Sequence, residues 1–237
     1  MEIIIVRHAE PNYTIDSLTA KGKHEAKLLS DRLIKENIDF FYCSPLGRAK
    51  KTAFYTLKRL TKPCETLDWL REFEGKITED GKETHCWDRL PSVWTADERH
   101  YTSLWNTTEL MNQLNVTEEY NRVSEGIDNL LAKHGYVHEG NLFRAVRPGR
   151  DKIVLFCHFA VECVILSHLF NMSPMILWHN FVALPSSVTR IITEEREEGI
   201  ASFRMTCFGD TSHLYKGDEE PSFMARFCEC FTDDTRH

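Results

Sequence analysis

Two histidines and two arginines, each following a predicted strand, could together bind and attack an anion. The chain opens with the apolar run Ile3–Val6, which stops abruptly at Arg7 and His8. Such a run fits a strand buried on both faces, whereas a cation beside an imidazole needs a partner or water. The change of polarity marks a strand end that faces a cleft and predicts an anion site there.

Arg48 and His158 follow later strands in a similar way. Asp39 to Cys43 is typical of a short aromatic strand, and Ser44-Pro45 then provides a helix cap and a first-turn proline. This pattern places Arg48 in the first turn of the next helix. His158 directly follows an apolar strand predicted from Lys152 to Cys157.

These residue types are suited to phosphate chemistry. Two guanidinium groups match the oxygens of a phosphate in a bidentate fork, and the amides of a helix starting near Ala160 add donors with a favourable dipole. A neutral imidazole can attack phosphorus, and neighbouring cations favour the neutral form. One histidine is therefore a candidate nucleophile, and the other can hydrogen-bond the equatorial oxygens of the transition state.

The order of predicted elements defines how these residues meet. Strands alternate with helices, which predicts an α/β three-layer sandwich with a mostly parallel central sheet, helices on both faces and ligands at the carboxyl ends of the strands. Residues 1–237 are expected to form a single domain. Residues 74–117 are polar and aromatic without a clean period and are expected to form an inserted cap. The other expected elements are helices over 19–37, 46–60, 118–134 and 160–170, and strands over 188–193 and 200–206.

Composition disfavours several classes of partner. A net charge of -7 and a pI near 5.9 do not attract nucleic acid or an anionic membrane. The sequence has no leader pattern and no apolar span of about 20 residues, which predicts a cytoplasmic location. We expect the partner to be a small-molecule phosphate ester or phosphate, and the sequence leaves the oligomeric state open.

The eight cysteines are scattered and are interpreted as reduced thiols. Cys228 and Cys230 form the one close pair, but a single intervening residue is tighter than the usual structural zinc spacing. The sequence therefore predicts no metal site and no cofactor.

Several short blocks along the chain, in this order and at plausible distances, carry a resemblance to a known family. They are Arg7-His8-Ala9-Glu10, Leu18-Thr19-Ala20-Lys21-Gly22 with Glu25-Ala26, Ser44-Pro45-Leu46-Gly47-Arg48-Ala49 with Thr52-Ala53, Phe156-Cys157-His158, and Ser187-Val188-Thr189 with Gly209-Asp210 and His213-Leu214. The set resembles the histidine phosphatase superfamily, also called phosphoglycerate mutase-like, and its phosphatase branch.

The resemblance implies a role for each candidate residue. His8 would be phosphorylated, Arg7 and Arg48 would clamp the phosphoryl group, and His158 would stabilise it. Leu70-Arg71-Glu72-Phe73 resembles the family's Leu-x-Glu motif, which makes Glu72 the candidate general acid. Glu74, two residues on, is the alternative.

The sequence thus predicts a metal-independent, histidine acid-phosphatase-like phosphomonoesterase that hydrolyses a small-molecule phosphate ester through a phosphohistidine on His8. One alternative is a phosphoglycerate-type phosphomutase. Another is a catalytically weak phosphate-binding or interaction module, because Ala9 and Phe159-Ala160 stand where the family usually has glycine or small residues. A further hypothesis is that Arg144, Arg147 and Arg150 bind a second anionic group of the substrate, a carboxylate or a further phosphate.

Overall fold

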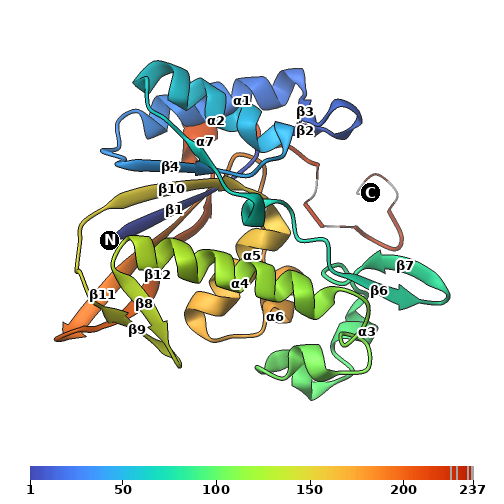
Figure 1. Ribbon diagram of the computed structural model, residues 1–237. Coiled ribbons are helices and arrows are strands. Elements are labelled where there is room, and N and C mark those ends of the chain that lie inside the picture. Colours follow the sequence, from blue (N-terminus) through green and yellow to red (C-terminus); the bar gives the residue numbers. More distant parts are fainter. Residues whose placement is uncertain (225, 228, 234, 236–237) are drawn as a thin grey trace.

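An eight-stranded sheet lies between two groups of helices in the computed structural model (Figure 1), which describes residues 1–224, 226–227, 229–233 and 235. Cys228 of the close cysteine pair lies outside these residues. The order of strands in the sheet is β5-β4-β10-β1-β11-β12-β9-β8. Their bounds are β1 Glu2–Arg7, β4 Phe40–Cys43, β5 Glu65–Thr66, β8 Tyr136–Glu139, β9 Leu142–Ala145, β10 Lys152–Cys157, β11 Val188–Glu197 and β12 Ile200–Asp210.

The sheet is mixed. β5, β4, β10 and β1 pair in parallel, whereas β11, β12, β9 and β8 continue the sheet from β1 with antiparallel pairs. The predicted α/β class with helices on both faces is confirmed, but the parallel part covers only half of the sheet. The reason is the short turn between β11 and β12, since a parallel connection needs a crossover of a dozen or more residues.

The alternation of side chains along the central strands divides the core between the two faces. Ile4 and Val6 pack with Leu29 of α1 (Ala20–Leu33) and Ala53 of α2 (Gly47–Leu60), and the short α7 (Ser212–Lys216) lies on the same face. Ile3 and Ile5 pack into the opposite cluster, which contains residues of α4 (Val116–Lys133), α5 (Phe159–Phe170) and α6 (Pro174–Asn180). Successive residues of β1 therefore pack against opposite helical layers.

Residues 74–117 contain small elements that are separate from the main sheet and lie near α4 and α6 (Figure 1). Trp94 and Trp105 are buried here, and they pack on His179 and Trp178 of α6, which makes them packing anchors. The elements are the hairpin β6 (Lys76–Glu79) and β7 (Lys82–His85), α3 (Pro91–Trp94), and the 3-10 helices η3 (Glu98–Tyr101) and η4 (Trp105–Thr107). Elsewhere, the short elements are β2 (Pro11–Asn12), η1 (Tyr13–Ile15), β3 (Ser17–Leu18) and η2 (Asp68–Leu70).

The structure corrects the predicted start of the second helix. α2 begins at Gly47 with Leu46 at the N-cap, so Ser44 does not cap it. Instead, Oδ2 of Asp16, from the loop after η1, accepts a hydrogen bond from the Gly47 amide at 2.5 Å. Arg48 is nevertheless in the first turn, as predicted.

Within the described part of the chain, no helix combines the length and the apolar character needed to cross a membrane.

Close packing at Gly22 of α1 yields a stability prediction. A Cβ atom at Gly22 would lie 2.1 Å from the Glu10 carbonyl oxygen. Alanine normally stabilises a helix interior by about 1 kcal/mol relative to glycine, but a backbone clash of this kind costs about 1–3 kcal/mol. The difference between these two effects predicts that Gly22→Ala lowers the free energy of unfolding by up to about 2 kcal/mol, as measured by urea denaturation.

The control for this variant is Gly149→Ala, because the nearest atom to its added Cβ would lie 3.9 Å away. We expect that change to stay within about 0.5 kcal/mol of the wild type. A stabilised Gly22→Ala variant would contradict the packing described.

Candidate active site

His8 and His158 lie side by side at the carboxyl ends of β1 and β10, two central strands of the sheet. Arg7 pairs with Cys157 in the parallel ladder of β1 and β10, so each histidine is the first residue beyond a paired strand end. The imidazole centroids are 5.1 Å apart, with an angle of 59° between the ring planes. Both side chains are buried. The predicted meeting of the two histidines is therefore confirmed.

The hydrogen bond of His8 determines which ring nitrogen is free. Nδ1 lies 2.8 Å from the carbonyl oxygen of Ala9. A carbonyl can only accept, so Nδ1 carries the hydrogen and the neutral ring has its lone pair on Nε2. Nε2 is therefore the atom available for nucleophilic attack.

His158 is oriented by a hydroxyl group from the neighbouring strand end. Its Nε2 lies 2.7 Å from Oγ of Ser44, which directly follows β4, and the Ser44 amide donates to the Phe156 carbonyl of β10. Oγ of Ser44 also accepts from the Leu46 amide. When the hydroxyl donates to Nε2, the hydrogen of neutral His158 lies on Nδ1, a buried atom without a protein partner among the described residues.

Arg7 is the last residue of β1 and directly precedes His8. Its Nη1 donates to the carbonyl oxygen of Ala183 at 2.5 Å, and its guanidinium carbon lies 5.4 Å from the centroid of the Phe159 ring. Its Nε is buried and has no hydrogen-bond partner in the described chain. The guanidinium group is thus fixed on one side and retains donor capacity on the other.

Arg48 is positioned by Asp16, which was not identified from the sequence. Nη1 of Arg48 contacts Oδ1 of Asp16 at 2.7 Å, while the same carboxylate caps α2 through Gly47. Nε of Arg48 is buried and finds no acceptor within the residues described. One carboxylate therefore fixes both the helix start and its arginine.

The two candidate acids differ in their surroundings. Oε1 of Glu72 accepts hydrogen bonds from the Phe73 amide at 2.8 Å and the Val161 amide at 3.0 Å, near the start of α5. Burial is the largest effect on its carboxyl group and raises the pKa, although the two amides, Arg7 and Arg48 oppose the increase. The side chain of Glu74 is exposed. The geometry therefore favours Glu72, which lies within the field of both arginines.

The electrostatic environment keeps both histidines neutral near neutral pH. Burial lowers the pKa of His8 well below 6.5, and the charges of Arg7 and Arg48 add to this decrease. Burial likewise lowers the pKa of His158, followed by the effects of His8, Arg48 and Arg7. The four groups act on one another, which places them around one site.

The departures from glycine do not distort this site. Ala9, Phe159 and Ala160 are not among the residues with positive φ, so an L side chain is accommodated at each position. The Ala9 carbonyl orients His8, and the Phe159 ring packs on Arg7. These substitutions therefore give no structural reason for an inactive site.

The cluster of Arg144, Arg147 and Arg150 does not belong to the site. Gly149 in this loop accepts a hydrogen bond from the amino group of Met1 at 2.9 Å, next to the start of β1. Arg7 lies at the opposite end of that strand, about 20 Å away for six residues. The hypothesis of a second anionic contact from these arginines is therefore wrong.

Glu162 is a buried acid near the site that sequence reasoning missed. It lies on α5, and its Oε1 accepts a hydrogen bond from Oγ1 of Thr189 at 2.5 Å. Burial raises its pKa to about 7, against the opposing effects of Thr189 and Arg7. An acidic residue inside the apolar run 159–170 was the available signal.

Comparisons with known proteins agree with this architecture. The family model of the histidine phosphatase superfamily (branch 1) matches residues 3–206. Phosphoserine phosphatase 1 of Hydrogenobacter thermophilus is 22% identical over 216 residues, covering 87% of this chain and 93% of the relative. A probable phosphatase of Schizosaccharomyces pombe is 24% identical over 233 residues, covering 90% and 95%.

Solved structures show the same fold. A mutant phosphoserine phosphatase from Entamoeba histolytica in complex with phosphoserine superposes with a TM-score of 0.62 at 17% identity, covering 90% of this chain and 98% of that one. The α-ribazole phosphatase from Shigella flexneri gives a TM-score of 0.57 at 20% identity, covering 89% and 97%. The chain belongs to the histidine phosphatase superfamily.

The environment of Glu162 predicts a pH-dependent effect on stability. Between pH 4.5 and about 7, the folded protein keeps a proton on Glu162 that the unfolded chain has released. The free energy of unfolding of the wild type therefore falls through this window, and Glu162→Gln removes that loss. We expect the variant to gain about 2–3 kcal/mol relative to the wild type between pH 5 and pH 8, in urea denaturation at each pH.

The lowered pKa values of His8 and His158 act in the opposite direction, but they are common to both proteins and cancel in the difference. Glu118→Gln, at an exposed position on α4, controls for the loss of one carboxylate. A difference between Glu162→Gln and wild type that does not change with pH would refute the prediction.

Proposed function

We propose that the protein is a phosphomonoesterase that hydrolyses a small-molecule phosphate ester through a phosphohistidine on His8. The observation that carries this proposal is the Nδ1 hydrogen bond of His8 to the Ala9 carbonyl. It leaves Nε2 as the free nitrogen in a buried site with two guanidinium groups and a second imidazole. Membership of the superfamily and its phosphatase relatives support the assignment.

In the first half-reaction, Arg7 and Arg48 bind the phosphate oxygens. Nε2 of His8 forms a bond to phosphorus as the bond to the ester oxygen breaks, and Glu72 gives its proton to that departing oxygen. Desolvation of the Glu72 carboxyl group raises its pKa, which shifts the group toward the protonated form that this step uses. Nδ1 of His158 donates to the equatorial oxygens as negative charge redistributes over them.

In the second half-reaction, water attacks the phosphohistidine. Glu72, now a carboxylate, takes a proton from the water while the new bond between oxygen and phosphorus forms. The bond between nitrogen and phosphorus breaks, and its electron pair returns to Nε2 of His8. Inorganic phosphate leaves, and the original protonation states are restored.

In this mechanism, Arg7 and Arg48 supply the positive charge that stabilises the transition state. The proposed reaction is therefore metal-independent. We expect hydrolysis to continue in the presence of a chelator. We also propose that the chain acts as one domain in which residues 74–117 form the cap over the substrate. The described relatives and neighbours act on different phosphate esters, so a panel of phosphorylated metabolites is the appropriate substrate screen.

The first prediction from this mechanism concerns the nucleophile. We expect the wild type to hydrolyse an aryl phosphate and His8→Ala to lose that activity, because no other described nitrogen occupies its position. His158→Ala should reduce turnover about 100- to 1,000-fold, by analogy with the removal of one transition-state donor. Rapid quenching with radiolabelled substrate should reveal an acid-labile phosphoenzyme in the wild type and none in His8→Ala.

Equal hydrolysis by wild type and His8→Ala would overturn the proposal. A phosphoenzyme that converts 3-phosphoglycerate to 2-phosphoglycerate without releasing phosphate would instead identify a mutase.

The second prediction concerns the acid. Protonation matters most for a poor leaving group, so Glu72→Gln should reduce the hydrolysis of an alkyl phosphate at least tenfold more than that of a nitrophenyl phosphate. Glu74→Gln is the matched control, two residues away on the same segment, and should behave like the wild type with both substrates. Steady-state kcat/KM values for the two esters provide the measurement. The opposite result for the two variants would assign the acid to Glu74.

A further inference from the structure

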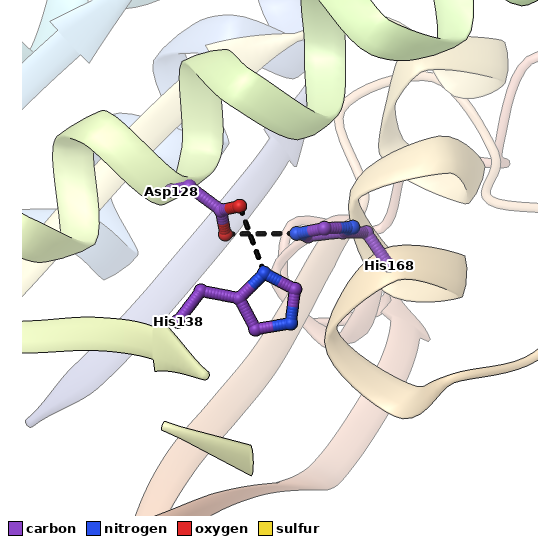
Figure 2. Close-up of side chains that lie close together, drawn as sticks. All are labelled: Asp128, His138 and His168. Carbon is purple, nitrogen blue, oxygen red and sulfur yellow. Dashed lines mark hydrogen bonds and ion pairs between the residues drawn. The ribbon is translucent and has the colours of Figure 1, made fainter. Parts of the chain in front are cut away.

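Three ionisable side chains that are not part of the proposed active site form a second cluster (Figure 2). Asp128 lies on α4, His138 on β8 and His168 near the carboxyl end of α5. Oδ1 of Asp128 is 2.8 Å from Nε2 of His168, and Oδ2 is 2.9 Å from Nδ1 of His138. One carboxylate therefore connects two imidazoles from separate parts of the chain, as Figure 2 shows.

The three groups offer ligand atoms that lie within 4.8 Å of one another. In a tetrahedral zinc site with bonds of about 2.0–2.2 Å, neighbouring ligand atoms are about 3.3–3.6 Å apart. Side-chain movements of about 1 Å would bring the atoms to these separations. Two imidazoles and one carboxylate form a known zinc ligand set, which leaves the fourth position for water.

The surroundings restrict the movement of the ligands. The His138 ring stacks on Phe143 of β9 with centroids 4.8 Å apart, and it meets the His168 ring edge to face at 4.7 Å. The side chains of Asp128, His138 and His168 are 28%, 24% and 12% exposed. The ligand atoms are thus held together without being closed off from solvent.

One of the three proposed ligands, His168, borders a cavity. His168 lines a cavity of about 300 Å³ together with polar side chains that include Asn106, Asn141 and Asn171. A polar cavity of this size has room for water, including a water molecule bound to a metal ion.

We propose that Asp128, His138 and His168 form a binding site for a divalent transition-metal ion, with zinc favoured. Magnesium and calcium are disfavoured because they prefer oxygen ligands. His168 follows His158 by ten residues on α5, which separates the two sites by about 15 Å. The ion would connect α4, β8 and α5 at a distance from the phosphate-binding groups.

The test is a zinc titration of the full-length protein by calorimetry, with a reductant present. We expect the wild type to bind one zinc ion per chain, and Asp128→Asn and His168→Gln to bind it at least tenfold more weakly. His134→Gln is the matched control, because His134 also contacts a carboxylate, Asp151, at 2.8 Å. Its other nitrogen is occupied by the Tyr42 hydroxyl at 2.9 Å, so this variant should retain zinc binding.

Two further measurements separate this site from other zinc ligands. His8→Ala should keep the affinity, because zinc bound by the active-site histidines would be lost in that variant. Cobalt bound by the wild type should show visible d–d bands without a thiolate charge-transfer band, which excludes the cysteines.

Thermal unfolding checks the fold of each variant and the effect of the ion. Zinc should raise the unfolding temperature of the wild type but not that of Asp128→Asn, which keeps the shape of the side chain. The proposal is overturned if the wild type shows no saturable binding, if Asp128→Asn and His168→Gln bind as tightly as the wild type, or if His8→Ala abolishes binding.

Discussion

The in-register parallel pairing of β1 with β10 is the constraint on which the site depends. Six consecutive residue pairs run from Glu2 with Lys152 to Arg7 with Cys157, and the His8 amide continues the ladder to the Cys157 carbonyl. A slip of one residue would move one histidine by about 3.3 Å relative to the other and exchange the side chains that pack on the two helical layers. The packing of two apolar helical layers therefore also sets the distance between the two imidazoles.

Burial then sets the protonation states that the proposed reaction needs. Removal from water disfavours charge, so it lowers the pKa of His8 and raises that of Glu72. The nucleophile is thus kept free of its proton while the acid tends to retain one. In water, with pKa values of about 6.5 and 4.3, the same two groups would both be charged at intermediate pH. Removal from water thus favours the neutral form of both His8 and Glu72, the nucleophile and the acid of the proposed phosphoryl transfer.

The sequence predicted the parts of the site that depend on local pattern. The change from apolar strand to Arg7-His8, and from strand to His158, is visible in the chain itself, and so is the first-turn position of Arg48. The role of Asp16 was not visible, because it depends on how the loop after η1 folds back onto α2.

Ser44 followed by proline has the local pattern of a helix cap, but its hydroxyl instead meets His158, 114 residues away in the chain. The proposed metal site was not predicted from the sequence for the same reason. Asp128, His138 and His168 have no characteristic spacing, and only the packing of α4, β8 and α5 brings them together. Long-range pairings of this kind follow from the fold and are not encoded in a short segment.

Glu72 contacts both α4 and α5. Its carboxylate is held by the Val161 amide of α5, while its carbonyl accepts a hydrogen bond from Arg122 of α4 at 3.3 Å. Glu119, also on α4, accepts from the Glu74 amide at 3.1 Å. The segment that carries the proposed acid is thus fixed between two helices.

Asp128 and His168 join these same two helices further along their length. A change in the relative placement of α4 and α5 at that cluster would therefore act on Glu72, which is held by both helices, whereas Arg7 meets α5 through Phe159.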